Sequence, residues 1–168
     1  MGLTFSVRPA AGEPELTGLS PAETVTALAR YKAEQVFAEC PGDTVIAADT
    51  LVFLDGEALG KPRDREDARR MLRALSGRSH EVYTGVAVRS PGGSRVRAER
   101  TAVRFRHLTD REIEAYLDTG EPMDKAGAYG AQGRAAVFIQ GIEGDFFNVM
   151  GLPVCALTVM LRELGEAV

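Results

Sequence analysis

The chain has 168 residues, of which 45% are hydrophobic and 26% are charged; these values are typical of a globular protein, so a fibrous or disordered chain is excluded and one domain over residues 1–168 is expected. A net charge of −4 argues against a nucleic-acid or membrane-surface partner, since both require a basic protein surface. Because no apolar run approaches the roughly 18 residues that span a bilayer and no signal-peptide pattern is present, we expect a cytoplasmic protein.

The first expected element is a helix, followed by a buried strand. Ser20 and Glu23 form a capping box, and apolar residues follow at helical spacing, which predicts a helix over residues 21–38. Residues 44–54 are almost continuously apolar and include β-branched side chains, so they are expected to form a buried strand. The pair Asp55-Gly56 then supplies the backbone conformations of a tight hairpin turn.

Helices and a long hairpin follow along the rest of the chain. A helix is expected between residues 64 and 77, a hairpin over residues 82–105, and further helices over residues 109–120 and 153–164. A glycine-dense stretch separates the last two helices. This mixture of elements predicts an α/β fold with a mixed, twisted sheet and flanking helices.

Two charged residues interrupt apolar patterns. Lys32 lies one helical turn from Leu28 and one from Val36, within the apolar stripe; its side chain either snorkels along apolar surface or presents its ammonium to an anionic ligand. Asp49 and Thr50 interrupt the strand that otherwise reads as buried. An unpaired buried carboxylate costs several kcal/mol, so Asp49 should have a cation, a metal or several donors nearby. Asp49 is the leading candidate for chemistry.

The lysines are few enough to be informative. The chain has seventeen arginines but only three lysines, which are Lys32, Lys61 and Lys125. Lysine is a compact, rotatable charge, so its rare positions in an arginine-rich chain favour sites that need such a charge. Pro62 biases Lys61 toward an extended backbone, which restricts where its ammonium can point.

A stripe of arginines in the long hairpin has two interpretations. It could bind nucleic acid, or it could be the solvated face of the hairpin. We favour the solvated face, because no aromatic residues interleave and the total charge is negative. The stripe consists of Arg95, Arg97, Arg100, Arg104 and Arg106.

A strand carboxylate with at least two lysines suits hydrolysis of a phosphoanhydride. A triphosphate needs positive charge on its oxygens, a divalent metal such as Mg²⁺ or Mn²⁺, and a group that activates water. Asp49 could hold the metal, orient the water, or do both. Glycosidase chemistry would need a second carboxylate at a defined separation, and the sequence singles out no such pair.

Several ordered motifs together resemble the Maf family over nearly the whole chain. The resemblance implies an α/β fold related to the inosine triphosphate pyrophosphatases, with a cleft between two lobes and cleavage between the α and β phosphates of a nucleotide. The motifs lie at residues 20–33, Ala47-Ala48-Asp49-Thr50, Gly60-Lys61-Pro62, residues 75–80, residues 121–130, Gly144-Asp145 and residues 149–153.

The resemblance also implies roles for individual residues. The aspartate that matches Asp49 is the catalytic base and metal-associated carboxylate of the family, and the lysines that match Lys32 and Lys61 bind phosphate. Lys125 is a further candidate cation. A glutamate also belongs to the site; Glu13 and Glu15 compete for this place, and we prefer Glu13.

The same resemblance suggests a substrate class. Gln132, together with Thr50, resembles the branch of the family that acts on dTTP, UTP and modified pyrimidine nucleotides. The expected partners are therefore a nucleoside triphosphate and, as an option, a second copy of the chain in a homodimer.

The resemblance has one departure. Family members begin with a strand and a phosphate-binding Ser-x-Ser-Pro-Arg-Arg loop, whereas this chain opens at residues 1–5, where the following strand is expected. We therefore expect weakened catalysis. The alternative hypothesis is a nucleotide-binding regulator with little turnover, linked to cell division and septum formation. An enzyme is favoured by four retained residues, Asp49, Lys32, Lys61 and Gln132.

Overall fold

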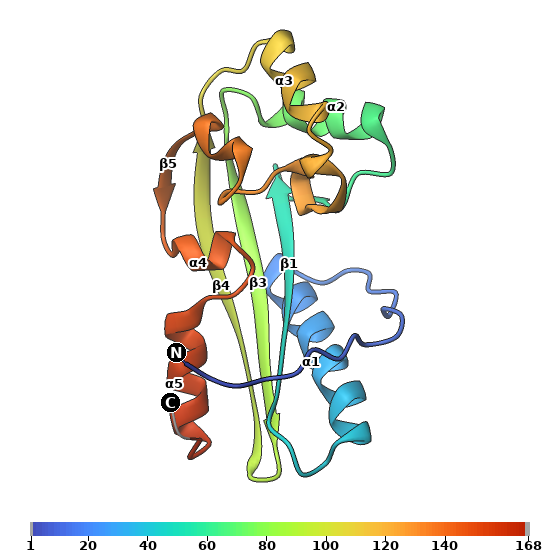
Figure 1. Cartoon of the computed structure of the whole chain (residues 1–168), viewed down its shortest axis with the longest axis vertical. Coiled ribbons are helices and arrows are strands. Elements are labelled where there is room, and N and C mark those ends of the chain that lie inside the picture. Colours follow the sequence, from blue (N-terminus) through green and yellow to red (C-terminus); the bar gives the residue numbers. More distant parts are fainter. Residues whose placement is uncertain (1, 167–168) are drawn as a thin grey trace.

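The computed structural model describes residues 2–166, which are organised around a long antiparallel sheet with strand order β2-β1-β3-β4-β5 (Figure 1). The strands are β1 (Val45–Leu54), β2 (Glu57–Leu59), β3 (Ser79–Ser90), β4 (Gly93–Phe105) and β5 (Ile139–Glu143). The α-helices are α1 (Pro21–Glu39), α2 (Arg65–Leu75), α3 (Asp110–Leu117), α4 (Phe146–Val149) and α5 (Val154–Glu163). Three short 3-10 helices are η1 (Glu121–Asp124), η2 (Ala126–Ala128) and η3 (Arg134–Phe138).

Local signals place the elements close to their predicted bounds. Both bonds of the α1 capping box form, since Glu23 N–H donates to Ser20 Oγ and Ser20 N–H donates to Glu23 Oε2. The β1–β2 turn has positive φ at Asp55 and Gly56, as expected. The α/β class with helices flanking a twisted sheet is confirmed. Within residues 2–166, no helix combines the length and apolarity needed to cross a bilayer.

The strand directions differ from the expected mixed sheet. All four pairings between the described strands are antiparallel. The reason lies in the connections: β1 ends at the side of the sheet where β2 and α2 follow, and β3 starts from that same side (Figure 1). A connection that returns to the same end of the sheet joins antiparallel neighbours, whereas parallel neighbours need a crossover.

Helices cover both faces of the lower half of the sheet in Figure 1. Alternating side chains of β3 point to opposite faces: Ala87 packs in a cluster with α1, while Val86 and Val88 pack with α5. The upper half carries a separate apolar cluster that includes residues from α2, α3 and the 3-10 segments. The two packed regions meet at the middle of β1, where the apolar pattern is interrupted.

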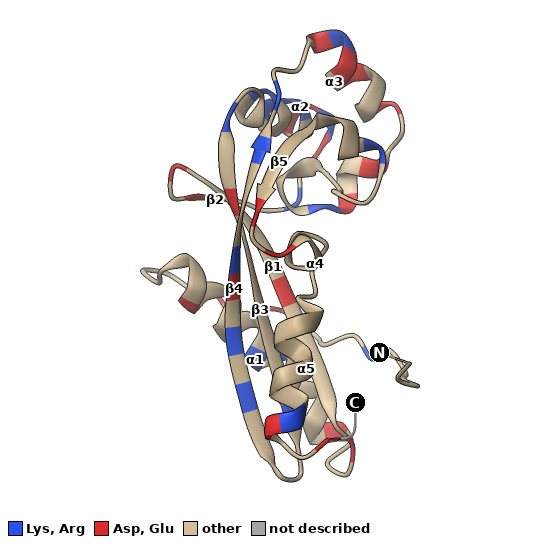
Figure 2. Ribbon diagram, turned by 90° about the vertical axis from the view of Figure 1, so that its left-hand side faces the viewer, with Lys and Arg blue, Asp and Glu red and all other residues tan. Residues whose placement is uncertain are grey.

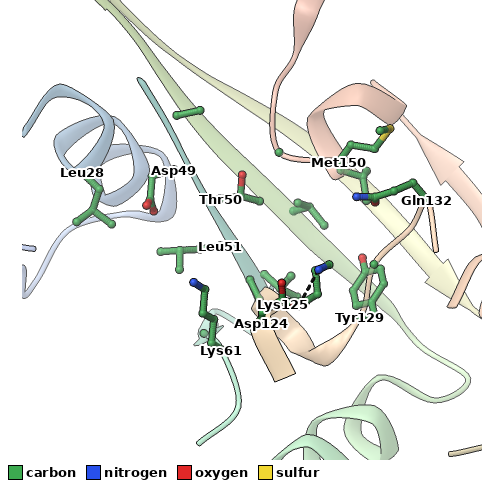
Figure 3. Close-up of a pocket in the computed structure, with 18 of the residues that line it drawn as sticks. Leu28, Asp49, Thr50, Leu51, Lys61, Asp124, Lys125, Tyr129, Gln132 and Met150 are labelled. Atoms are coloured by element: carbon green, nitrogen blue, oxygen red, sulfur yellow. Dashed lines mark hydrogen bonds and ion pairs between the residues drawn. The ribbon is translucent and has the colours of Figure 1, made fainter. Parts of the chain in front are cut away.

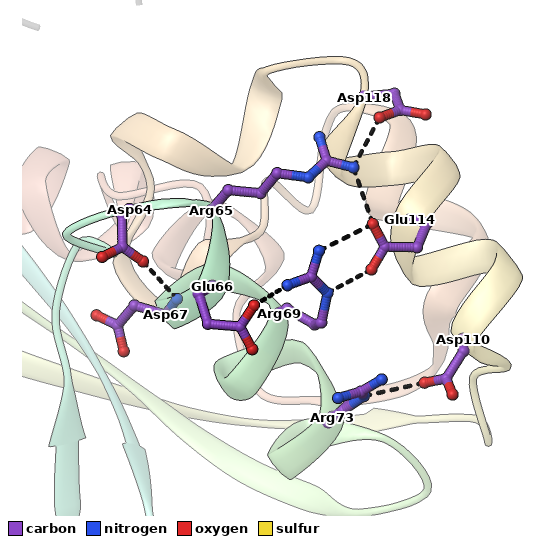
Figure 4. A network of polar contacts seen from close by, with 9 residues as sticks. All are labelled: Asp64, Arg65, Glu66, Asp67, Arg69, Arg73, Asp110, Glu114 and Asp118. Carbon is purple, nitrogen blue, oxygen red and sulfur yellow. Dashed lines mark hydrogen bonds and ion pairs between the residues drawn. The ribbon is translucent and has the colours of Figure 1, made fainter.

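Helices α2 and α3 are joined by a network of ion pairs (Figure 4). Glu114 of α3 accepts hydrogen bonds from Arg65 and Arg69 of α2, and these lower the pKa of Glu114 to about 2. Arg73 of α2 also donates to Asp110 at the start of α3, at 2.9 Å. These pairs are largely exposed, where individual ion pairs stabilise a protein only weakly, so their main effect is to align the two helices.

The first residues do not form the strand that the resemblance implied. Met1 lies outside the described residues, and residues 2–19 contain no helix or strand. The side chains of Phe5 and Val7 are 81% and 80% exposed. A β-strand needs a neighbouring strand for its backbone groups, and residues 2–5 pair with no described strand. Further along the segment, Ala11 N–H donates to Gln35 Oε1 of α1.

The arginine stripe of the long hairpin lies along β4 (Figure 2), with Arg106 directly after the strand. Four of its five arginines pair with carboxylates of the same chain. Arg95 and Arg97 both contact Glu163 of α5, and Arg100 contacts Glu81 of the neighbouring strand. This charge neutralisation supports the interpretation of the stripe as a solvated hairpin face.

A buried histidine should make stability depend on pH. His80 is 2% exposed, contacts Tyr129 Oη through Nε2, and has its pKa lowered to about 4 by burial. Well above pH 6.5, His80 is neutral in both the folded and the unfolded protein. Between about pH 6.5 and 4, His80 of the unfolded chain takes up a proton, whereas His80 of the folded protein does not. We therefore expect the free energy of unfolding to fall by about 3 kcal/mol as the pH is lowered through this window. Urea unfolding at pH 7 and 4.5 measures the change.

Two histidine variants make this measurement specific. In His80→Gln, the free energy of unfolding should depend less on pH. In His107→Gln, which replaces an exposed histidine, the pH dependence should stay as in the wild type. Equal pH dependence in the wild type and His80→Gln would contradict the assignment.

Candidate active site

A cavity of about 560 Å³ lies where the two packed regions meet (Figure 3). This volume is within the range of small-molecule sites. Its walls come from the middle of β1, the segment after β2, the 3-10 segments and the end of α4. The lining includes the predicted residues Glu13, Asp49, Thr50, Lys61, Lys125 and Gln132. The fold thus gathers six side chains that are spread over most of the sequence.

Asp49 lies in the middle of β1, opposite Gly85 of β3. Its side chain is 12% exposed, and its Oδ1 accepts a hydrogen bond of 2.5 Å from Lys32 Nζ. Burial raises the pKa of Asp49, and the bond and charge of Lys32 offset part of that effect. The carboxylate therefore has the nearby cation that its position in the strand required.

Lys32 reaches Asp49 from α1 because the helix packs very closely on the sheet. An added Cβ on Gly85 would lie 2.0 Å from the carbonyl oxygen of Val25, so the helix backbone rests directly on this glycine. Lys32 is two turns after Val25 and projects from the same side of the helix. The position that looked anomalous in the apolar stripe is the one that faces Asp49.

Glu13 completes this cluster. Its Oε1 lies 2.7 Å from Lys32 Nζ, so a single ammonium contacts two carboxylates. Burial by itself lowers the pKa of Lys32, but hydrogen bonds and charge interactions with Asp49 and Glu13 outweigh burial, and the pKa is raised. Of the two glutamates left open by the sequence, Glu13 lines the cavity and Glu15 is not among its lining residues.

Lys61 and Thr50 line other parts of the cavity. Lys61 is exposed and follows Gly60, whose carbonyl accepts a hydrogen bond from Gly127 N–H at 3.0 Å. This bond ties the Lys61 segment to the 3-10 segments. The Thr50 hydroxyl lies 2.8 Å from the Thr84 hydroxyl, so it is held against β3.

Gln132 and Lys125 lie between the 3-10 helices on the other side of the cavity (Figure 3), Lys125 between η1 and η2 and Gln132 between η2 and η3. Gln132 is exposed, and its side chain extends toward the cavity near Met150. Lys125 donates a hydrogen bond of 2.7 Å to Asp124, which also lines the cavity. Sequence reasoning missed Asp124, although it lies in a segment that carried the family resemblance, because an aspartate beside a lysine resembles an ordinary surface pair.

A buried polar network that the sequence did not reveal supports one wall. Asn148 of α4 is fully buried and donates to Val82 O and to Thr101 Oγ1, at 3.1 and 2.9 Å. The backbone carbonyl of Asn148 accepts a hydrogen bond from the Thr84 hydroxyl at 3.0 Å. This network fixes α4 on the sheet and thereby the cavity residues that follow it. The only signal in the sequence was one amide in an apolar run.

The carboxylates present fit a divalent cation. Asp49 Oδ1 and Glu13 Oε1 lie 2.5 and 2.7 Å from the same ammonium, so both carboxylates already face one cationic group. Carboxylate oxygens are the ligands that Mg²⁺ prefers, and Mg²⁺ is commonly held by one or two carboxylates plus the phosphates of a substrate. Mn²⁺ accepts the same donor type.

Comparison with known proteins identifies the family of the chain. The family described as "Maf-like protein" matches residues 1–164. A dTTP/UTP pyrophosphatase of Moorella thermoacetica is 52% identical, over 98% of this chain and 87% of that protein. Proteins of the same name from Carboxydothermus hydrogenoformans and Symbiobacterium thermophilum are each 50% identical, over 96% and 98% of this chain and 88% and 86% of their own length. The chain therefore belongs to the Maf family.

Proposed function

We propose that this chain hydrolyses nucleoside triphosphates, with dTTP and UTP as preferred substrates, to the nucleoside monophosphate and pyrophosphate. The observation that carries the proposal is the contact of Lys32 with both Asp49 and Glu13 at the edge of a cavity that also receives Lys61 and Gln132. Membership of the Maf family and the names of the relatives support it.

Each residue has a distinct part in the proposed reaction. Asp49 orients a water molecule and accepts its proton as the water oxygen bonds to the α phosphorus. The bond from this phosphorus to the oxygen that bridges to the β phosphate breaks, and pyrophosphate leaves with the bonding electrons. Lys32 and Lys61 oppose the negative charge on the phosphate oxygens. Asp49 and Glu13 would hold the divalent cation, which when bound neutralises phosphate charge and favours ionisation of water.

Release of pyrophosphate tests the proposal directly. The protein should convert UTP and dTTP to equal amounts of monophosphate and pyrophosphate with Mg²⁺ or Mn²⁺. In water labelled with heavy oxygen, the label should enter the monophosphate, because the α phosphorus is attacked. Orthophosphate as the first product, or label in pyrophosphate alone, would overturn the proposed reaction.

Gln132 should select the base. A side-chain amide can donate to and accept from the edge of a pyrimidine. We expect Gln132→Ala to reduce the ratio of kcat/KM for UTP over GTP by about tenfold, since hydrogen bonds of this kind are worth that much when one partner is removed. Steady-state kinetics with both nucleotides measure this ratio, and an unchanged ratio would remove Gln132 from base selection.

Lys32 should compete with the cation. Because its ammonium pairs with both carboxylates, Lys32→Met is expected to strengthen binding of Mn²⁺ in the absence of nucleotide by about tenfold or more. Calorimetric titration with MnCl₂ measures the affinity. Lys125→Met is the matched control, since Lys125 pairs with Asp124 instead. Weaker binding of Mn²⁺ to Lys32→Met would show that the two carboxylates do not form the cation site.

The regulatory alternative is not supported. The relatives are named for catalysis, and no finding connects the chain to cell division.

A further inference from the structure

The segment from Glu121 to Arg134 contributes several side chains to the cavity but has little regular structure of its own. It contains short 3-10 turns, and two successive residues have positive φ, Gly127 at 67° and Ala128 at 61°. Ala128 has a Cβ, so this left-handed conformation is unfavourable for it. Contacts elsewhere must therefore hold the segment in the shape that presents Lys125 and Gln132.

The carboxylate of Glu121 makes such contacts. Its Oε1 accepts a hydrogen bond from the Tyr116 hydroxyl at 3.0 Å. The backbone N–H of Arg134 donates to both of its oxygens, at 3.0 and 3.1 Å. The Tyr116 hydroxyl in turn accepts from Gly130 N–H at 3.2 Å. Residues on either side of Gln132 are thus tied to one carboxylate, directly at Arg134 and through a hydroxyl at Gly130.

The glycines of the segment are packed around the same carboxylate. A Cβ on Gly133 would lie 2.1 Å from Glu121 Oε1, so only glycine permits this approach. A Cβ on Gly130 would lie 3.3 Å from Lys125 Cε and 3.4 Å from Glu121 Oε1. Glu121 and the Lys125 stem therefore both border Gly130. Glu121 itself is not among the residues that line the cavity.

We propose that Glu121 is a positioning residue that sets nucleotide affinity and base selectivity by holding the segment that carries Lys125 and Gln132. It acts through these side chains and does not touch the substrate. The inference rests on the proposed function for its choice of nucleotide. It predicts that loss of Glu121 harms binding and selectivity more than turnover, because Asp49 and Lys32 lie on β1 and α1.

Two substitutions of Glu121 separate position from charge. In Glu121→Ala, KM for UTP should rise at least about tenfold, and the UTP-over-GTP ratio of kcat/KM should fall, while kcat changes by less than about threefold. Glu121→Gln should remain within about threefold of the wild type in all three quantities, because its amide oxygen can still accept from both Tyr116 and Arg134.

A carboxylate of α3, in the same packed region as Glu121, provides the control. Glu114 also accepts several hydrogen bonds, but only from α2, so Glu114→Ala reports general weakening of the lobe. It should leave KM and selectivity unchanged. The double variant Glu121→Ala/Gln132→Ala should lose no more selectivity than Gln132→Ala alone, since both changes act through one side chain. Additive losses, or equal effects of Glu114→Ala and Glu121→Ala on KM, would overturn the proposal.

A measurement without turnover keeps this inference separate from the proposed reaction. Hydrogen exchange at the amides of Gly130 and Arg134 should be faster in Glu121→Ala than in the wild type, and the α,β-methylene analogue of UTP should bind at least about tenfold more weakly. If the wild type released no pyrophosphate but bound the analogue, and Glu121→Ala weakened that binding as described, the proposed reaction would be wrong and the positioning role would stand. Unchanged exchange and unchanged analogue affinity would refute the positioning role even in an active enzyme.

Discussion

Replacing Asp49 by asparagine is expected to lower kcat for UTP by about 10²- to 10⁴-fold, the usual contribution of a positioned acid or base. The amide keeps the size of the carboxylate and can still accept the bond from Lys32, so the fold should be retained. It cannot take a proton from water, and it is a poorer ligand for a divalent cation. Steady-state kinetics with saturating UTP, together with a thermal unfolding curve, separate loss of chemistry from loss of structure.

The control for this variant is Asp55→Asn. Asp55 lies in the turn that ends β1, is exposed, and pairs with Arg78 at 2.7 Å. The change from acid to amide is the same, but it occurs outside the cavity, so kcat should be unaffected. Near-native kcat in Asp49→Asn would assign Asp49 to structure and leave Glu13 as the leading carboxylate.

The second large effect is expected at Gly85, because even a methyl group added there would collide with the backbone of α1. In Gly85→Ala the new Cβ would lie 2.0 Å from the carbonyl oxygen and 2.3 Å from the carbonyl carbon of Val25. Backbone atoms of a helix cannot rotate away as a side chain can, so α1 must move off the sheet. Overpacking of this kind costs about 3 kcal/mol or more, which for a protein of this size lowers Tm by roughly 6–12 °C.

Displacement of α1 also has a consequence for catalysis. Lys32 is held over Asp49 by the close packing at Gly85, so kcat/KM should fall even below the unfolding temperature. Gly42→Ala is the matched control, because a Cβ at Gly42 meets no atom within 4 Å. An unchanged Tm in Gly85→Ala would mean that α1 does not rest on this strand position.

The sequence could identify Asp49 and Lys32 because each breaks a regular apolar pattern. A carboxylate in a buried strand and an ammonium in the apolar stripe of a helix are unfavourable unless they have partners. The sequence pattern alone reveals this conflict. The helices were also predictable, since capping boxes at Ser20 and Thr109 depend only on residues three positions apart. The antiparallel direction of the strands was not predictable, because it depends on the end of the sheet to which each connecting segment returns.

Other parts of the site left no comparable signal. Glu121 and Asp124 lie in a glycine-rich segment without periodicity, where a charged residue is unremarkable. Asn148 makes its contacts with residues more than forty positions away, at Val82 and Thr101. Such contacts are set by packing of distant segments, which local patterns do not encode.

The sequence by itself determined the helices α1, α2, α3 and α5, the strand β1, the β3–β4 hairpin, the α/β class and the two residues whose charges conflict with their surroundings; it did not predict β5, α4 or the 3-10 helices of the glycine-dense stretch. Only the tertiary structure decided that Glu13 joins Lys32 and Asp49, because residues 2–19 have no periodic pattern and are placed by contacts with α1 and the sheet. It also decided that the Glu121 carboxylate accepts hydrogen bonds from Tyr116 and Arg134. Periodicity and capping are short-range properties of the chain, whereas the meeting of distant carboxylates, lysines and amides follows from the close packing of α1 and the 3-10 segments around one strand.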